Sequence, residues 1–315
     1  MFRFGSSLLA INVIALAVSI APAHAQQARS FVSGLGSDLN APNCTRTAPC
    51  RTFQTAHNNT IPSGEITVLD AGSYGSLTIN RNISIINDGV GEAGALVSGG
   101  GVGITISAGP TDRVSLRGLT IKGLDPAFGG SNGIRFNSGG SLIIDNCTIT
   151  NQTGDGIQLL DAPPANTRVP ITISHTFVAD NGGNGILVQP SGTGLLDVVL
   201  NRVEMYSNSA NGFAVTVSGT AVTAVDSVAA HNGSSGFSAS HTTLVAKRLV
   251  AVYNLGSGLI ADGATIMLSE AMATFNSGGD LRCINSGHLA STQDSLFLTT
   301  DTIGGCGATG VLVKQ

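Results

Sequence analysis

The chain contains no tryptophan, and aromatic residues make up only 4% of its 315 residues. Charged residues are also scarce, at 11%, and lysine and arginine form no run anywhere in the sequence. Binding to nucleic acids or anionic membranes requires clustered positive charge, so neither partner is expected. The scarcity of aromatic rings also removes the usual stacking platform for sugars, which lowers the expectation of tight saccharide binding without excluding it.

No Cys-x-x-Cys or Cys-x-x-His spacing occurs, so no zinc site is expected. No cofactor is predicted either. The five cysteines favour an oxidising compartment. We predict one disulfide between Cys44 and Cys50, which close a small loop, and a second between Cys283 and Cys306 near the C-terminus. Cys147 lies in an apolar stretch and is predicted to be a buried free thiol.

Residues 1–25 have the form of a secretory signal peptide. Arg3 supplies the positive charge, residues 8–20 are predominantly apolar, and Ala23 and Ala25 frame a small-x-small cleavage site. The apolar run is too short for a transmembrane anchor, and no later segment is long enough to span a bilayer. We therefore expect cleavage after Ala25 and a secreted or periplasmic mature protein.

A single pattern repeats along the remaining chain: Asn, three variable residues, Gly and a large apolar residue. The unit at Asn151 has the same form with one extra residue, and the unit at Asn276 ends the series with Asp280 in place of Gly. The glycines of the series are Gly133, Gly156, Gly185, Gly212, Gly236 and Gly258, which lie 22 to 29 residues apart. Self-similarity at such a period is typical of solenoids.

Short alternating strands flank each repeat marker. Ile186 and Val188 follow one glycine with a single residue between them, so both point to the same side of a strand, into a core. Such strands are too short to be stable alone and must pair with their counterparts in the next rung. Asparagine can hydrogen-bond to backbone at a sharp corner and can stack in a ladder. The predicted ladder residues are Asn151, Asn181, Asn208, Asn232, Asn254 and Asn276.

This repeat resembles that of the pectate-lyase-like right-handed parallel β-helix superfamily. The N-terminal blocks at residues 45–56 and 64–70, followed by Tyr74-Gly75, are similar to exported bacterial β-helix proteins of unassigned activity. The resemblance implies an all-β, right-handed parallel β-helix with N- and C-terminal caps. The expected divisions are the signal peptide at 1–25, a cap and first strands at 26–75, rungs at 76–285 and a C-terminal cap at 286–315. A short capping helix is expected between Thr52 and Thr60.

The repeat register defines columns of outward side chains that stand about 4.8 Å apart in neighbouring rungs. One column lies between the two core positions that follow each marker Gly, and its polar members Arg135, Gln158 and Arg282 are candidate binding residues. The column contains no carboxylate. A glycoside hydrolase needs two carboxylates, and a calcium-assisted lyase needs clustered Asp or Glu, so this column provides neither chemistry.

A second column, six residues before each marker Asn, carries a titratable or charged group in every rung. Its members are Arg117, Asp145, His175, Arg202, Asp226, Arg248 and Glu270. One interpretation is an ion-pair ladder along a solvated corner. The other is a catalytic site in which His175 acts as a base between Asp145 and Arg202. We favour the ladder, because ion-pair networks cluster charges without catalysis.

Three hypotheses for function follow. The favoured one is an exported β-helix that presents an extended polar surface to a polysaccharide or another cell-surface component, without demonstrable catalysis. The second is a polysaccharide lyase, hydrolase or epimerase that uses the patch from Asp145 to Arg202 or a loop residue, with calcium as a cofactor only if it is a lyase. The third is a structural rod. Carboxylates converging in a groove beside the proline-rich loop at 161–170 would favour the enzyme, and a flat polar face would favour the binding protein.

Overall fold

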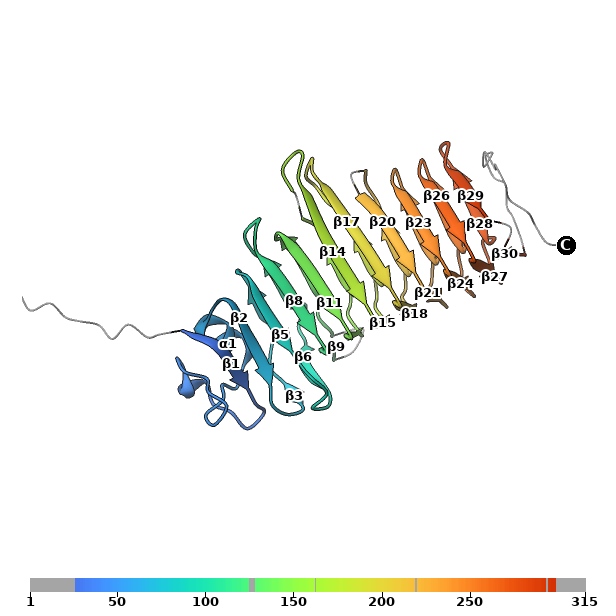
Figure 1. Ribbon diagram of the computed structural model, residues 1–315. Helices are drawn as coiled ribbons and strands as arrows, with labels where there is room; N and C mark the ends of the chain where they lie inside the picture. The colour runs from blue at the N-terminus through green and yellow to red at the C-terminus, as the bar shows by residue number, and fades with distance from the viewer. Residues whose placement is uncertain (1–25, 125–127, 162, 219, 293, 299–315) are drawn as a thin grey trace, which may run out of the picture.

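The computed structural model describes residues 26–124, 128–161, 163–218, 220–292 and 294–298. They form a right-handed parallel β-helix in which each rung passes through three sheets in turn, and the rungs follow one another along the solenoid (Figure 1). The predicted fold class is confirmed. Among the described residues, no helix is long and apolar enough to cross a membrane.

Sheet 1 has eleven strands and contains the longest ones. They are β1 (Gln27–Val32), β2 (Thr60–Val68), β5 (Ile83–Ile86), β8 (Arg113–Arg117), β11 (Ser141–Asp145), β14 (Arg168–Ser174), β17 (Leu195–Asn201), β20 (Thr220–Val225), β23 (Thr243–Lys247), β26 (Thr265–Ser269) and β29 (His288–Ser291). Sheet 2 follows sheet 1 within each rung. Its strands are β3 (Gly72–Ser73), β6 (Ala93–Val97), β9 (Thr120–Gly123), β12 (Thr148–Thr150), β15 (Phe177–Ala179), β18 (Glu204–Tyr206), β21 (Val228–Ala230), β24 (Val250–Val252), β27 (Met272–Thr274) and β30 (Leu296–Phe297).

Sheet 3 completes the rung before the chain returns to sheet 1. Its strands are β4 (Leu77–Ile79), β7 (Val102–Ser107), β10 (Asn132–Ser138), β13 (Ile157–Leu159), β16 (Ile186–Val188), β19 (Phe213–Val215), β22 (Phe237–Ser240), β25 (Leu259–Asp262) and β28 (Leu281–Ile284). Alternation fills the interior: Ile171 and Ile173 of β14 are fully buried, while Thr172 between them faces outward. The core is therefore a continuous column of Ile, Leu, Val, Ala and Phe inside the three sheets.

The predicted asparagine column lies buried at the corner between sheets 2 and 3. Each side-chain amide donates to the Oδ1 atom of the next asparagine, over 2.9 Å from Asn181 to Asn208, 3.0 Å from Asn208 to Asn232, and 2.9 Å in the next two steps, to Asn254 and Asn276. Each also donates to an interior carbonyl, as Asn208 does to Val178 over 3.1 Å. At the C-terminal end, Asn276 donates to Oδ1 of Asp280 over 3.0 Å. The chain of amides therefore ends on a buried carboxylate acceptor.

Asn151 was predicted to belong to this ladder, and that prediction is wrong. Asn151 has a φ of 59° and is only half-buried, while Gln152 is fully buried and occupies the ladder position. The backbone N–H of Gln152 donates to Oδ1 of Asn181 over 3.1 Å. The extra residue was misplaced: Gln152 stands four residues before Gly156, as Asn181 does before Gly185, so the repeat is regular with glutamine as its marker.

A second polar ladder, not anticipated from the sequence, runs parallel to the first. Asn184 donates to Oδ1 of Asp155 over 2.9 Å, and Asn211 donates to Oδ1 of Asn184 over 3.0 Å. Here the amides point toward the N-terminus, whereas those of the first ladder point toward the C-terminus. Asp155 is the acceptor at the end of this second chain. Each ladder therefore ends on an aspartate at its acceptor end, which favours the polarised arrangement of the amides.

Glycine is required at the marker positions because backbone and side-chain atoms of the next rung come very close to them. A Cβ atom at Gly212 would lie 2.8 Å from the carbonyl oxygen of Gly236 and 2.9 Å from Nδ2 of Asn232. Gly212 has no positive φ, so its role does not depend on left-handed backbone. The repeat therefore combines a buried amide with a glycine that lets the next rung pass beside it.

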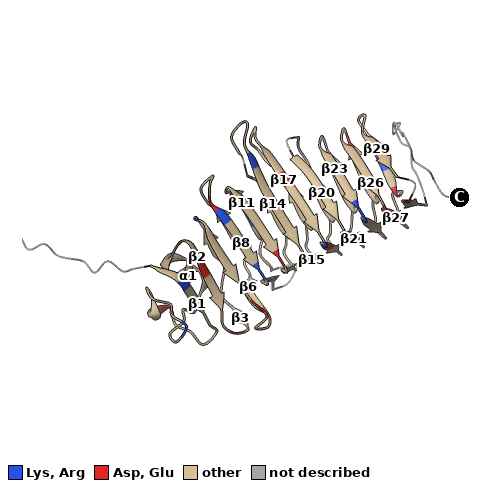
Figure 2. Cartoon of the chain, in the orientation of Figure 1, with Lys and Arg blue, Asp and Glu red and all other residues tan. Residues whose placement is uncertain are grey.

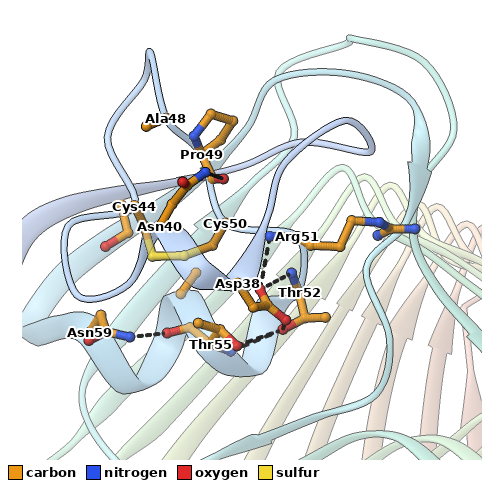
Figure 3. The surroundings of a disulfide bond; sticks show 12 residues. Asp38, Asn40, Cys44, Ala48, Pro49, Cys50, Arg51, Thr52, Thr55 and Asn59 are labelled. Atoms are coloured by element: carbon orange, nitrogen blue, oxygen red, sulfur yellow. Dashed lines mark hydrogen bonds between the residues drawn. A yellow bond between two sulfur atoms is a disulfide. The ribbon is translucent and has the colours of Figure 1, made fainter.

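The N-terminal end of the solenoid is covered by a compact cap (Figure 3). The helix expected between Thr52 and Thr60 is α1 (Phe53–Asn59), whose N-cap is Thr52 and whose residue Phe53 is buried. Asp38, in the 3-10 helix η1 (Asp38–Asn40), accepts hydrogen bonds from the backbone N–H groups of Arg51 and Thr52 over 2.9 and 3.0 Å. These bonds fix the cap against the start of the helix.

The predicted disulfide between Cys44 and Cys50 is present and braces this cap. The backbone N–H of Phe31 donates to the carbonyl of Cys44, and the N–H of Cys50 donates to the carbonyl of Phe31. The loop thus pairs with the outer edge of β1, which would otherwise be exposed. Cys147 is a buried free thiol, as predicted. Cys306 and residues 1–25 lie outside the described residues, so the pairing of Cys283 with Cys306 and the signal peptide remain predictions.

Candidate functional site

The corner between sheets 1 and 2 carries the predicted charged column. His175, Arg202, Asp226, Arg248 and Glu270 each follow the last residue of a sheet 1 strand and have φ between 47° and 54°. This left-handed conformation turns the chain sharply from one sheet to the next, at a cost of about 1 kcal/mol for each residue other than glycine. The side chains project outward, where they can be solvated or can contact a ligand.

Asp145 and Arg117 do not share that backbone position, which corrects the predicted register. They are the last residues of β11 and β8, and the corner itself is occupied by Asn146 and Gly118. Asp145 aligns with Ser174 rather than with His175. The shift has the same origin as that at Asn151, because Gln152 is the marker of this rung and the position six residues before it is Asn146.

The three catalytic candidates nevertheless meet. Nδ1 of His175 lies 3.1 Å from Oδ1 of Asp145, and Nη1 of Arg202 lies 3.2 Å from Nε2 of His175. The hydroxyl of Ser174 also donates to Oδ1 of Asp145, over 2.7 Å. The Ser174 hydrogen bond, followed by the contact with His175, lowers the pKa of Asp145 below its usual value and keeps it ionised.

The geometry assigns a tautomer to His175. A guanidinium group only donates hydrogen bonds, so Nε2 of His175 is the acceptor from Arg202 and Nδ1 carries the proton that points to Asp145. In this arrangement the lone pair of Nε2 is occupied and is not free to take a proton from a substrate. A shallow depression of about 330 Å³ lies beside the cluster and is lined by His175, Thr176, Phe177, Arg202 and Glu204.

Further along the corner, the column is an ion-pair network. Arg248 binds Asp226 through two nitrogens and lies 3.6 Å from Glu270, which also contacts Nζ of Lys247 over 3.1 Å. The hydrogen bond from Arg248 lowers the pKa of Asp226. At this end of the corner, the arrangement matches the ion-pair ladder that we favoured.

A larger groove of about 660 Å³ lies on the outward face of sheet 1, over β5, β8, β11 and β14. Its lining is rich in hydroxyl groups, carries one arginine and includes no aspartate or glutamate. The lining residues are Asn82, Ser84, Pro110, Thr111, Arg113, Val114, Ser115, Gly140, Ser141, Leu142, Ile143, Pro170 and Thr172. Figure 2 shows that the strands of this sheet are mostly uncharged, with charged residues gathered toward their ends.

The proline-rich loop borders this groove. Asp161, Pro163 and Pro164 line an adjoining hollow of about 300 Å³, in which Asp161 is the single carboxylate and is buried. Val169 and Pro170, predicted as part of the loop, belong to β14. The convergent pair of carboxylates that would indicate a hydrolase is therefore not found in either hollow.

The binding candidates on sheet 3 are only partly brought together. Strand pairing confirms the register of their column, in which Arg135 aligns with Gln158 and Arg282 aligns with Ile260. Nε of Arg135 donates to Oε1 of Gln158 over 3.0 Å. Arg282 is separated from that pair by four strands, and Leu187 and Ile260 interrupt the polar surface between them. This column does not form one continuous polar site.

The residues of the sheet 1 groove were not identified from the sequence. Ser84 and Ser115 align across neighbouring strands, but no spacing marks them, because the turns between sheets 3 and 1 differ in length from rung to rung. Among the described residues, no group of three or more His, Cys, Asp or Glu side chains could hold a metal ion.

A family model described as right handed beta helix region matches residues 50–228 and 103–269. No curated protein matches the chain. Among solved structures, the chain is similar to the pectate lyase Pel9A, with a TM-score of 0.60 and 14% identity over 91% of this chain and 78% of that chain. It is also similar to an alginate lyase from Paenibacillus sp. str. FPU-7, with a TM-score of 0.57 and 16% identity over 84% and 94%.

A third similar structure is the A-module of the mannuronan C-5 epimerase AlgE4 from Azotobacter vinelandii. Its TM-score is 0.51, with 18% identity over 75% of this chain and 78% of that chain. At these identities the likeness is one of fold alone, a fold that is shared with polysaccharide lyases and epimerases.

Proposed function

This chain belongs to the right-handed β-helix family, and on that basis we propose that it is an exported protein that binds a polysaccharide without turning it over. The observation that carries the proposal is the groove on sheet 1, whose lining offers hydroxyl groups and Arg113 but no carboxylate. Stacked serine and threonine side chains at the rung spacing suit the repeating hydroxyl groups of a glycan. The disulfide in the cap supports export to an oxidising compartment.

The proposed binding mode places an extended glycan across the strands, along the solenoid axis. Ser84, Ser115, Ile143 and Thr172 stand in one outward column of β5, β8, β11 and β14, so successive sugars would meet successive rungs. Ile143 is 45% exposed and offers an apolar contact for a sugar face. Pro110 and Pro170 provide stiff edges to the groove.

Binding can be tested with a groove-filling variant. Ser115→Tyr places a ring in the groove and should weaken binding to a responsive polysaccharide at least tenfold, measured by affinity electrophoresis against pectate, alginate and neutral cell-wall glycans. The matched control is Thr223→Tyr, in the same column of sheet 1 but on β20, beyond the groove. Equal binding by both variants would remove the groove from the proposal, and binding to no glycan would leave the structural rod.

The alternative function is a lyase, hydrolase or epimerase activity of the patch from Asp145 to Arg202. The observation in its favour is the hydrogen-bonded chain from Asp145 through His175 to Arg202, in which displacement of Arg202 by an anionic substrate would free Nε2 to act as a base. We propose that this does not occur. The reason is that Arg202 occupies Nε2 of His175, and that no cation-binding cluster adjoins the patch among the described residues.

We expect no turnover of pectate or alginate by the mature protein, with or without calcium. A lyase would produce rising absorbance from unsaturated sugar ends, and a hydrolase would release reducing ends. If either signal appeared and was abolished in His175→Ala but kept in Arg248→Ala, the patch would be an active site and the binding proposal would fail. Arg248 is the control because it shares the corner but lies two rungs away from Arg202.

A further inference from the structure

The outward face of sheet 2 is apolar over its C-terminal half. The middle residue of each short strand points inward, and the first residue is at least partly exposed, as are the third residues Tyr206 and Val252. The first residues form one column across β15, β18, β21, β24, β27 and β30. That column is Phe177, Glu204, Val228, Val250, Met272 and Leu296, with Glu204 as its single charged member. Figure 1 shows most of these strands following one another along the lower edge of the solenoid.

The border of this face at the corner between sheets 2 and 3 is aromatic. His231, Tyr253 and Phe275 stack in successive rungs, with ring centroids 5.2 and 5.3 Å apart and planes within 7° of each other. Tyr253 and Phe275 are 50% and 62% exposed, and neighbouring Leu255 is 68% exposed. In a chain with so few aromatic residues, this concentration beside an apolar sheet marks a contact surface.

We propose that this face is the interface of a homodimer, in which two copies pack sheet 2 against sheet 2 with antiparallel solenoid axes. The face spans six strands at a spacing of about 4.8 Å and is roughly 20 Å wide with its corners, so each copy would bury about 500–600 Å². The total of roughly 1,000–1,200 Å² reaches the lower end of the range for specific interfaces.

The order of charges along the opposite border selects the second copy as the partner. Arg202, Asp226, Arg248 and Glu270 run along the corner between sheets 1 and 2 as plus, minus, plus, minus. A two-fold axis perpendicular to the solenoid reverses this order in the second copy. Arg202 then faces Glu270 of its partner, and Asp226 faces Arg248. Each of these charges in one copy thus meets an opposite charge in the other, as is required when both copies use the same surface.

The same two-fold axis also passes through the middle of the apolar column. It passes between β21 and β24, so Val228 lies opposite Val250 of the second copy, and Phe177 lies opposite Leu296. Charge order and apolar contacts therefore agree on one register. Glu204 is the exception: it would face Met272 and lose part of its hydration, so it weakens the dimer and gives the test a variant that should tighten it.

The test measures mass by sedimentation equilibrium of the mature protein across micromolar concentrations. We expect a reversible dimer, a loss of affinity of at least a hundredfold in Val250→Glu, and a tighter dimer by severalfold in Glu204→Leu. The control is Val245→Glu, in the same rung but on sheet 1, where Val245 is 42% exposed. It should leave the dimer unchanged.

A second pair of variants tests the charge order. Arg248→Glu should weaken the dimer, and adding Asp226→Arg to it should restore the affinity, since both the internal pair and the facing pair are then re-formed with reversed signs. Circular dichroism and thermal melting establish that each variant is folded. A wild-type protein that is monomeric throughout, or a dimer that persists in folded Val250→Glu, would overturn the proposal.

Discussion

The corner between sheets 2 and 3 and the corner between sheets 1 and 2 make the same turn with different chemistry. In the rungs whose sheet 1 strands are β11 to β26, one residue at each of these corners has a positive φ, as in Ser207 and Arg202, and the next residue is buried. Between sheets 2 and 3 that buried residue is an asparagine of the ladder, or Gln152 in the rung before Asn181. Between sheets 1 and 2 the buried residue varies, and Thr176, Val203 and Leu249 all occupy it.

The comparison shows that the turn and the asparagine ladder are separate features of the corner. Because Val203 and Leu249 serve at one corner, a buried amide is not needed to turn the chain. The ladder instead adds side-chain hydrogen bonds to interior backbone carbonyls, such as that of Val178, and links each rung to the next. At the other corner, exposed ion pairs link the rungs on the outside, and inside, single hydroxyl groups, such as that of Ser227, accept a backbone N–H from the neighbouring rung. We therefore expect the buried corner to contribute much more to stability.

Asn208→Ala, in the middle of the buried ladder, should have the largest effect on stability. It removes the acceptor for both the backbone N–H and the side chain of Asn181, and it removes the side-chain hydrogen bond to the carbonyl of Val178. The free energy of unfolding should fall by about 1–3 kcal/mol, measured by urea denaturation. The control is Asn201→Ala, in the same rung at an outward position, which should change stability little. Equal effects from the two variants would contradict the special role of the buried corner.

Gln152→Asn, unlike Asn208→Ala, should raise the stability of the protein. Oε1 of Gln152 is buried without a hydrogen-bond partner, and its side-chain nitrogen donates to backbone carbonyls rather than to Asn181. Asparagine has the length that the ladder uses, so this change should extend the ladder by one rung and raise the free energy of unfolding by about 0.5–1.5 kcal/mol. The exposed Gln189, changed to Asn, serves as the control. Destabilisation would mean that the larger glutamine is needed to fill this rung.

The fold was predictable because one solenoid rung repeats its requirements at every period. Gly212 is required by the close approach of the next rung, and Asn208 by its hydrogen bond to the next asparagine. Both requirements recur in the next rung, so six imperfect copies were enough to identify the β-helix. The register failed at Asn151 for a physical reason. Asparagine is as well suited to the left-handed corner position as to the ladder position, and two polar amides stand side by side there.

The candidate site was less predictable than the fold. The contact of His175 with Asp145 survived the register error, because a side chain at the end of β11 can still reach the corner of the next rung. The groove on sheet 1 could not be found in the sequence. It depends on turns such as that at Gly140, whose length is not repeated, and on the hydroxyl groups of Ser115 and Ser141, which also occur throughout the surface.

Arg248→Ala, at the exposed corner, should have the smallest effect. Its ion pairs with Asp226 and Glu270 are solvated, and such pairs are weak and screened by salt. At about pH 7 and low salt, the urea midpoint should fall by less than in Asn208→Ala. In about 1 M salt, where the screening length is roughly 3 Å, the difference from wild type should shrink further.

The dependence on pH completes that prediction. The pKa of Asp226 in the folded protein is lowered by the hydrogen bond from Arg248, so it lies below the value of about 3.9 for an unfolded chain. The stabilisation is therefore present above that unfolded value and is lost as the pH falls through the folded pKa. In Arg248→Ala this part of the acid dependence should disappear, so its urea midpoint should approach that of wild type as the pH falls below the folded pKa of Asp226. If the urea midpoint of Arg248→Ala stayed below that of wild type by the same amount at every pH and salt concentration, Arg248 would act through packing of its aliphatic stem rather than through its charge.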